Sequence, residues 1–174
     1  MSIIKMRFSV RTVNGLKNLV NDLPDKFSMV EIGCYAGEST NIFLNSGKIS
    51  KFYAVDSWVS GYDDNDLASN SDLKLAEKEF DKVISKFNNV VKLKDFSKNA
   101  ISKVDELVDF VYIDANHNYD SVINDINLWK NKIKPNGFIG GHDYGTKHIG
   151  VTKAVDELFK IKKIYCDSSW LVKL

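Results

Sequence analysis

A strand-like run that leads through a glycine turn into a helix-like segment constrains the fold of this chain most strongly. The run covers residues 27–32, and Gly33 and Gly37 follow it before the helix-like segment begins. Glycine lets the backbone approach a ligand closely. The spacing E-x-G-x-x-x-G differs from the dinucleotide pattern G-x-G-x-x-G, and a carboxylate at Glu31 would repel a pyrophosphate. The turn therefore favours a nucleoside-like ligand that carries hydroxyls and a positive charge.

Strand-like and helix-like segments alternate along the chain, a pattern typical of a parallel sheet with helices on both faces. The expected strands are 29–32, 51–56, 90–93, 110–114, 137–141, 163–166 and 170–173, and the expected helices are 13–23, 39–45, 73–87, 119–132 and 151–159. Only residues 167–169 separate the last two strands, which is too short for a parallel crossover. We therefore predict an α/β fold with a mostly parallel seven-stranded sheet and an antiparallel C-terminal strand.

Length and composition indicate one globular domain over residues 1–174. Of these residues 44% are hydrophobic and 27% are charged, and the net charge is +1. This balance disfavours nucleic acid as a partner, because nucleic-acid binders more often carry a strongly basic surface. The two cysteines have no spacing typical of a zinc site or a disulfide framework. No run approaches the roughly 20 apolar residues of a membrane span, so we expect a cytoplasmic protein with no membrane partner.

Acidic residues lie at the ends of five successive expected strands or just after them. They are Glu31, Asp56, Asp95, Asp114 and Asp143, the last preceded by His142. In open α/β sheets, ligands bind beyond the carboxyl ends of the strands. An acid at position 56 can accept hydrogen bonds from both ribose hydroxyls, and Asp95 with Ser97 can meet an adenine amino group. For Asp95, an Asx turn that caps the next helix is the structural alternative.

Four segments together resemble class I S-adenosylmethionine-dependent methyltransferases, and most nearly the small macrocin-type sugar O-methyltransferases. They are residues 31–37, 55–58, 111–119 and 140–144, within a resemblance that covers about residues 28–160. This resemblance implies a Rossmann-like fold that binds S-adenosylmethionine. It places the cofactor against Glu31, Gly33, Tyr35, Gly37, Asp56, Ser57, Trp58, Asp95, Phe96, Ser97 and Asp114.

The same resemblance implies a divalent-metal site at Asp114, His142 and Asp143, with Asp114 and His117 as catalytic residues. His117 is the expected base, because an imidazole accepts a proton near neutral pH. Oxygen ligands suit Mg²⁺, and a histidine ligand shifts the choice toward Mn²⁺. Related enzymes often have two acids or Asp-Asn where this chain has His142 and Asp143. The alternatives are a solvated His117 at a helix start and a His142 that only orients Asp143, while His148 is expected in an exposed loop.

The stretch 57–72 after the second strand is expected to be a long loop, and long loops in compact domains are usually functional. Trp58 and Tyr62 can stack on an adenine or a sugar ring, or one of them can anchor the loop to the surface.

The leading hypothesis is a metal-assisted O-methyltransferase that acts on a hydroxyl of a small saccharide-like or polyhydroxylated acceptor. A homo-oligomer is compatible with this hypothesis. A nucleotide-dependent oxidoreductase or epimerase, with NAD(P) as cofactor, is the first alternative, because Asp56 would serve NAD equally well. Glu31, the glycine spacing and the lack of a Tyr-x-x-x-Lys pair oppose it. A non-catalytic cofactor-binding module is the second alternative.

Overall fold

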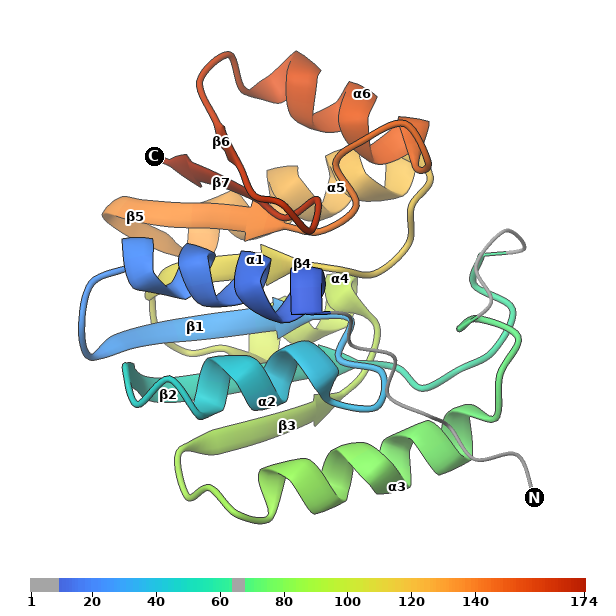
Figure 1. Cartoon of the computed structure of the whole chain (residues 1–174). Helices are drawn as coiled ribbons and strands as arrows, with labels where there is room; N and C mark the ends of the chain where they lie inside the picture. Colours follow the sequence, from blue (N-terminus) through green and yellow to red (C-terminus); the bar gives the residue numbers. More distant parts are fainter. Residues whose placement is uncertain (1–9, 64–67) are drawn as a thin grey trace.

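The computed structural model describes residues 10–63 and 68–174 (Figure 1). Its centre is a seven-stranded sheet in the order β3-β2-β1-β4-β5-β7-β6. The strands are β1 (Phe27–Ile32), β2 (Ile49–Asp56), β3 (Val90–Lys94), β4 (Val108–Ile113), β5 (Ile133–Gly141), β6 (Lys163–Ile164) and β7 (Trp170–Lys173). Strands β1 to β5 pair in parallel, and β7 is antiparallel to both β5 and β6. The predicted sheet and its antiparallel C-terminal strand are confirmed.

Helices cover both faces of the sheet (Figure 1). One face carries α1 (Val10–Asp22), α2 (Glu38–Leu44) and α3 (Leu73–Ile84), and the other carries α4 (Ser97–Ala100), α5 (Tyr119–Trp129) and α6 (Ile149–Leu158). The short 3₁₀ turns η1 (Ile101–Lys103) and η2 (Lys130–Lys132) follow α4 and α5. The sequence analysis missed α4 and η1, because four residues and one further turn are too short to show helical periodicity.

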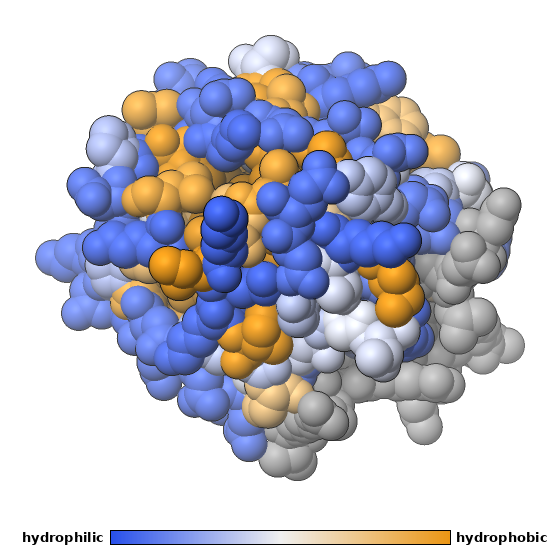
Figure 2. All heavy atoms as spheres, turned by 90° about the horizontal axis from the view of Figure 1, so that it is seen from above, coloured by the Kyte–Doolittle hydropathy of each residue, from blue (hydrophilic) through white to orange (hydrophobic). Residues whose placement is uncertain are grey.

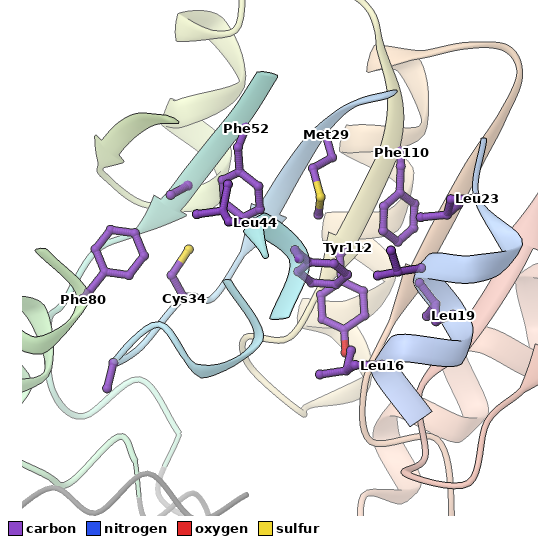
Figure 3. Packing of buried hydrophobic residues seen from close by; sticks show 14 of the residues in the cluster. Leu16, Leu19, Leu23, Met29, Cys34, Leu44, Phe52, Phe80, Phe110 and Tyr112 are labelled. Atoms are coloured by element: carbon purple, nitrogen blue, oxygen red, sulfur yellow. The ribbon is translucent and has the colours of Figure 1, made fainter. Parts of the chain in front are cut away.

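Alternation along β1 supplies side chains to two separate cores. Phe27 and Met29 belong to the core under α1, α2 and α3, whereas Val30 and Ile32 belong to the core under α4, α5 and α6. Figure 3 shows the first core, where Leu16 and Leu19 of α1, and Leu23 just after it, lie beside the aromatic residues of β4. Since successive strand residues point to opposite faces, Glu31 belongs to the side of α1, α2 and α3.

Strand β5 begins four residues before its predicted start at Gly137. Ile133 pairs with Val108 and Phe138 pairs with Phe110, so an irregularity lies between the two pairs. Asn136 has a φ of 63° within this stretch. Pro135, Asn136 and Gly137 therefore form a bulge inside the strand. Helix α5 ends at Trp129, three residues before the expected end at residue 132.

The order of the strands opens a crevice at the carboxyl ends of β1 and β4. These strands are neighbours, yet the chain passes from β1 to α2 on one face and from β4 to α5 on the other. Such a divergence is the usual place of a ligand site in an open α/β sheet. None of the described helices is long and apolar enough to cross a membrane. Figure 2 shows hydrophilic residues interspersed with hydrophobic ones on the face seen from above.

Candidate active site

Backbone hydrogen bonds join the strand ends that carry the predicted site. The N–H of Gly33 donates to the carbonyl of Val55 (2.9 Å), and the N–H of Asp114 donates to that of Ile32 (2.8 Å). The N–H of His142 donates to the carbonyl of Ile113 (3.1 Å). The ends of four neighbouring strands are thereby held in register, and the residues just beyond them converge.

The carboxylate of Asp56 organises the glycine turn. One oxygen accepts from the N–H groups of Cys34 and Tyr35, both at 2.9 Å, and the other accepts from the N–H of Trp58 at 2.7 Å. Burial raises the pKa of Asp56, and these three backbone hydrogen bonds oppose the rise. Asp56 therefore shapes the turn in addition to facing the cavity described below.

Gly33 and Gly37 are required by the protein backbone itself. Gly33 has a φ of 87°, and a Cβ at this position would lie 1.9 Å from the carbonyl oxygen of Asp114. Gly37 has a φ of 86° where α2 begins, and its Cβ would meet Phe80 and Val83 at 3.2 and 3.3 Å. In the structure the neighbouring strand end approaches Gly33 closely, while the predicted contact of Gly33 with a ligand stays a prediction.

Besides Gly37, two residues predicted to contact the cofactor lie away from the cavity surface. Glu31 is 0% exposed, and its carboxylate accepts from the hydroxyls of Ser39 and Thr40 beneath the turn. Burial raises the pKa of Glu31 to about 7. Trp58 packs on Phe80 in the core, and its indole N–H donates to the carbonyl of Tyr35 at 2.8 Å. Trp58 thus anchors the loop after β2, which was the alternative to stacking on a ligand ring.

A first cavity of about 350 Å³ opens beyond the carboxyl ends of β1, β2, β3 and β4. Eight residues of the predicted cofactor site line it, namely Gly33, Tyr35, Asp56, Ser57, Asp95, Phe96, Ser97 and Asp114. Glu31, Gly37 and Trp58 are not among the lining residues. The sequence analysis missed Ser121, Asn124 and Asp125, which line the cavity from α5. Their spacing of i, i+3 and i+4 is the signal that identifies one polar helix face.

A second cavity of about 370 Å³ adjoins the first. The two share the lining residues Gly33, Tyr35, Tyr62, Asp114 and Ala115. The second cavity is further lined by the predicted His117, His142 and Asp143, together with Glu38, Ser39, Lys147 and His148. The predicted catalytic and metal-binding residues therefore gather in one compartment, beside the compartment of the predicted cofactor residues.

His117 and Asp143 are the centre of this cluster. The Nε2 atom of His117 lies 2.8 Å from a carboxylate oxygen of Asp143, and its Nδ1 lies 3.3 Å from Asp63. The ring of His148 stacks on that of His117 with 4.1 Å between centroids. His148, which we expected in an exposed loop, has a side chain only 15% exposed, so that expectation was wrong. Asp63 also accepts from the N–H of His117 at 3.2 Å, which ties the loop after β2 to the site.

The cluster concentrates charge. Burial by itself would raise the pKa of Asp143, but hydrogen bonds from His117 and His142 outweigh it and hold the pKa well below its usual range. Burial likewise would lower the pKa of His142, but the charges of Asp114, Asp143 and Asp167 raise it to about 9. Asp143 has a φ of 63°, a conformation uncommon for residues other than glycine and often found at functional sites.

Two overlapping sets of side chains can hold a metal ion. One is the predicted set Asp114, His142 and Asp143, and the other is His117, Asp143 and His148. In each set, one ligand atom from every residue lies within 4.8 Å of the others. The Nε2 atom of His142 is buried with no hydrogen-bond partner among the described residues. The donors therefore fit a divalent cation, and the geometry leaves two choices for its ligands.

A family model for a methyltransferase domain matches residues 30–144, and the chain belongs to this family. The prediction of a methyltransferase domain is therefore confirmed. An uncharacterized protein of Acanthamoeba polyphaga mimivirus is 27% identical over 139 residues, which cover 74% of this chain and 57% of that protein. The chain thus spans little more than half the length of this relative.

Solved methyltransferase structures share the fold. The O-methyltransferase NovP matches with a TM-score of 0.67 and 17% identity, over 95% of this chain and 80% of its own. An rRNA methylase from Streptococcus thermophilus matches with a TM-score of 0.66 and 15% identity, over 96% and 97% of the two chains. An O-methyltransferase from Bacillus cereus in complex with S-adenosylhomocysteine (SAH) matches with a TM-score of 0.62 and 12% identity, over 95% and 80%. The Rossmann-like methyltransferase fold is confirmed.

Proposed function

We propose that this protein is an S-adenosylmethionine-dependent O-methyltransferase whose first cavity holds the cofactor and whose second holds the acceptor. The observation that carries the proposal is the shared wall of the two cavities at Gly33, Tyr35 and Asp114. Methyl transfer from a sulfonium is an in-line displacement, so the donor and the acceptor oxygen must meet about 3 Å apart. Two compartments that adjoin beyond the strand ends provide that arrangement.

The first cavity suits a cationic nucleoside. Four carboxylates line it, those of Asp56, Asp95, Asp114 and Asp125, against the single described cation Lys98. A sulfonium is attracted by this excess of negative charge, whereas the pyrophosphate of NAD(P) is repelled by it. The balance favours S-adenosylmethionine over the oxidoreductase alternative.

His117 is the proposed base in the second cavity. An alcohol must lose its proton during methyl transfer, and the imidazole of His117 lines the compartment that would hold the alcohol. A divalent cation bound by Asp114, His142 and Asp143 would lower the pKa of the acceptor hydroxyl and orient it. Asp63, 3.3 Å from Nδ1, would orient the ring of His117, and Nε2 would be available to accept the proton when Asp143 binds the cation instead.

The acceptor that we propose is a small polyhydroxylated molecule of the saccharide class, as for macrocin-type enzymes. The second cavity is lined by hydrogen-bonding side chains that include Glu38, Ser39 and Lys147. Such a lining matches the donors and acceptors of several adjacent hydroxyls. The net charge of +1 gives no support to an rRNA acceptor.

Calorimetry with SAH and with NAD tests the proposed cofactor. We expect SAH to bind, in the presence or absence of EDTA, and NAD not to bind. Binding of NAD without binding of SAH would replace this proposal by the oxidoreductase alternative. Binding of SAH without methylation of any member of a sugar and polyol panel, in Mg²⁺ and in Mn²⁺, would favour the non-catalytic module.

Electron paramagnetic resonance of added Mn²⁺ tests the metal site and the base together. If the proposed set holds the metal, Asp114→Asn should abolish Mn²⁺ binding and His117→Ala should retain it. His117→Ala should then lower the methylation rate by roughly 10²–10⁴, the usual contribution of a general base. The reverse pattern, with binding lost in His117→Ala and His148→Ala, would make His117 a ligand and overturn its role as the base.

A further inference from the structure

Asp95 is the residue that the sequence analysis assigned to the adenine amino group, but its oxygens are already engaged. One accepts from the N–H of Phe96 at 2.8 Å and from the amide of Asn99 at 2.9 Å. The other pairs with the ammonium of Lys103 at 2.6 Å. Hydrogen bonds from Lys103 and Asn99 hold the pKa of Asp95 down to about 2. Asp95 is therefore held by residues at the start of α4 and just after it, although α4 itself has no side-chain cap.

Asp125 lines the same cavity from α5 and has an available oxygen. Its Oδ1 atom accepts from the hydroxyl of Ser97 at 2.5 Å, and that hydroxyl accepts from the indole N–H of Trp129 at 2.8 Å. Trp129 is fully buried, so this chain of hydrogen bonds starts from a rigid point in the core. The Oδ2 atom of Asp125 has no hydrogen-bond partner among the residues that the structure describes.

The surroundings of Asp125 suit a planar base. Phe96, which lines the cavity, is 49% exposed and offers an aromatic surface for stacking. Ser97, Asn124 and Asp125 line the first cavity only. The wall that the first cavity shares with the second includes Gly33 and Asp114. Asp56, which is predicted to bind the ribose hydroxyls of the cofactor, lines the same cavity.

We propose that Asp125, oriented by Ser97, accepts a hydrogen bond from the exocyclic amino group of the cofactor's adenine and selects that base. The naming of the cofactor rests on the proposed function. A carboxylate only accepts hydrogen bonds, and it therefore matches an amino group. In hypoxanthine a carbonyl oxygen replaces the amino group, and two acceptors would then face each other.

Calorimetry with SAH and its 6-oxo analogue S-inosylhomocysteine tests this assignment. We expect wild type to prefer SAH by about ten- to hundredfold, the worth of one hydrogen bond to a charged group. Asp125→Asn should reduce the preference to less than about threefold, because a rotated carboxamide can donate to the carbonyl oxygen. Ser97→Ala should reduce it in part. Asp120→Asn, which changes an exposed acid of α5 outside both cavities, is the matched control and should keep the preference.

The outcomes separate this inference from the proposed function. An unchanged preference in Asp125→Asn, with a preference lost in Asp95→Asn, would return the role to Asp95 and overturn the inference. Thermal unfolding without ligand identifies any variant that fails to fold, and Asp125→Glu then provides a second test in which the preference should persist. If SAH does not bind, adenosine and inosine replace the two ligands. An Asp125-dependent preference for adenosine would then support the base assignment while the methyltransferase proposal fails.

Discussion

At the scale of single residues, three acids at neighbouring strand ends have different structural roles. Glu31 lies within β1 and points beneath α2, so it bonds to hydroxyls there. Asp56 ends β2 and accepts three backbone N–H groups of the adjoining turns. Asp114 lies one residue beyond β4 and faces both cavities. The alternation of side chains along β1 turns Glu31 toward α2, and the position of Asp114 beyond the end of β4 lets it face the cavities.

Glu31→Gln should change how stability depends on pH. The folded pKa of Glu31 is about 7, above its ordinary value of 4.5, so the folded state binds the proton more strongly and stability falls as pH rises through this range. Glutamine carries no charge and removes this loss. From pH 5 to pH 8, the unfolding free energy of the variant should rise relative to wild type by about 2–3 kcal/mol.

Urea unfolding at the two pH values measures this difference, and contributions of all other groups cancel when the variant is compared with wild type. A difference that is independent of pH would show that Glu31 titrates in the folded protein as it does in the unfolded chain.

At the scale of elements, the glycine turn is a joint between strands. Gly33→Ala should lower the unfolding free energy by more than about 3 kcal/mol, because the added Cβ meets the backbone of Asp114 at 1.9 Å and the φ of 87° is unfavourable for alanine. Gly47 is the matched control, because it has a φ of 72° and a Cβ added there would have no neighbouring atom within 4 Å.

Gly47→Ala should cost only about 1 kcal/mol, the conformational part of the effect. Chemical denaturation of the two variants separates close packing from backbone conformation. Equal losses in both variants would mean that the turn can shift away from β4, and the contact with Asp114 would then have little importance for stability.

At the scale of the whole molecule, the C-terminal hairpin completes the core beside the site. Strand β7 lies between β5 and β6, and Trp170 at its start is 1% exposed against the core of α5 and α6. Trp170→Ala should lower the unfolding free energy by about 3–5 kcal/mol. Ile161→Ala, at a residue 88% exposed, should change it by less than about 0.5 kcal/mol.

Equilibrium unfolding followed by far-ultraviolet circular dichroism compares these two variants without relying on tryptophan fluorescence. A small loss of unfolding free energy in Trp170→Ala would indicate that the sheet is stable without the packing of Trp170. The hairpin would then contribute little to the stability of the fold around His142 and Asp143.

The sequence by itself determined the order of the elements and the set of polar residues at the strand ends. Hydrophobic periodicity is local, so the strands and most helices could be predicted, and parallel pairing then placed Asp114, His142 and Asp143 at one edge. The short span 167–169 was enough to require an antiparallel hairpin. These inferences needed only neighbouring residues and the general geometry of α/β sheets.

Only the tertiary structure decided which of those residues line the two cavities. Glu31 and Trp58 are turned into the core, and Asp95 is engaged by Lys103, while Asp125 and His148 enter the two cavities from other elements. The direction of a side chain near a turn depends on backbone torsions and on partners distant in the chain, which no local pattern records. A site assembled from several loops is therefore defined by their packing, whereas the strands that support it are defined by periodicity.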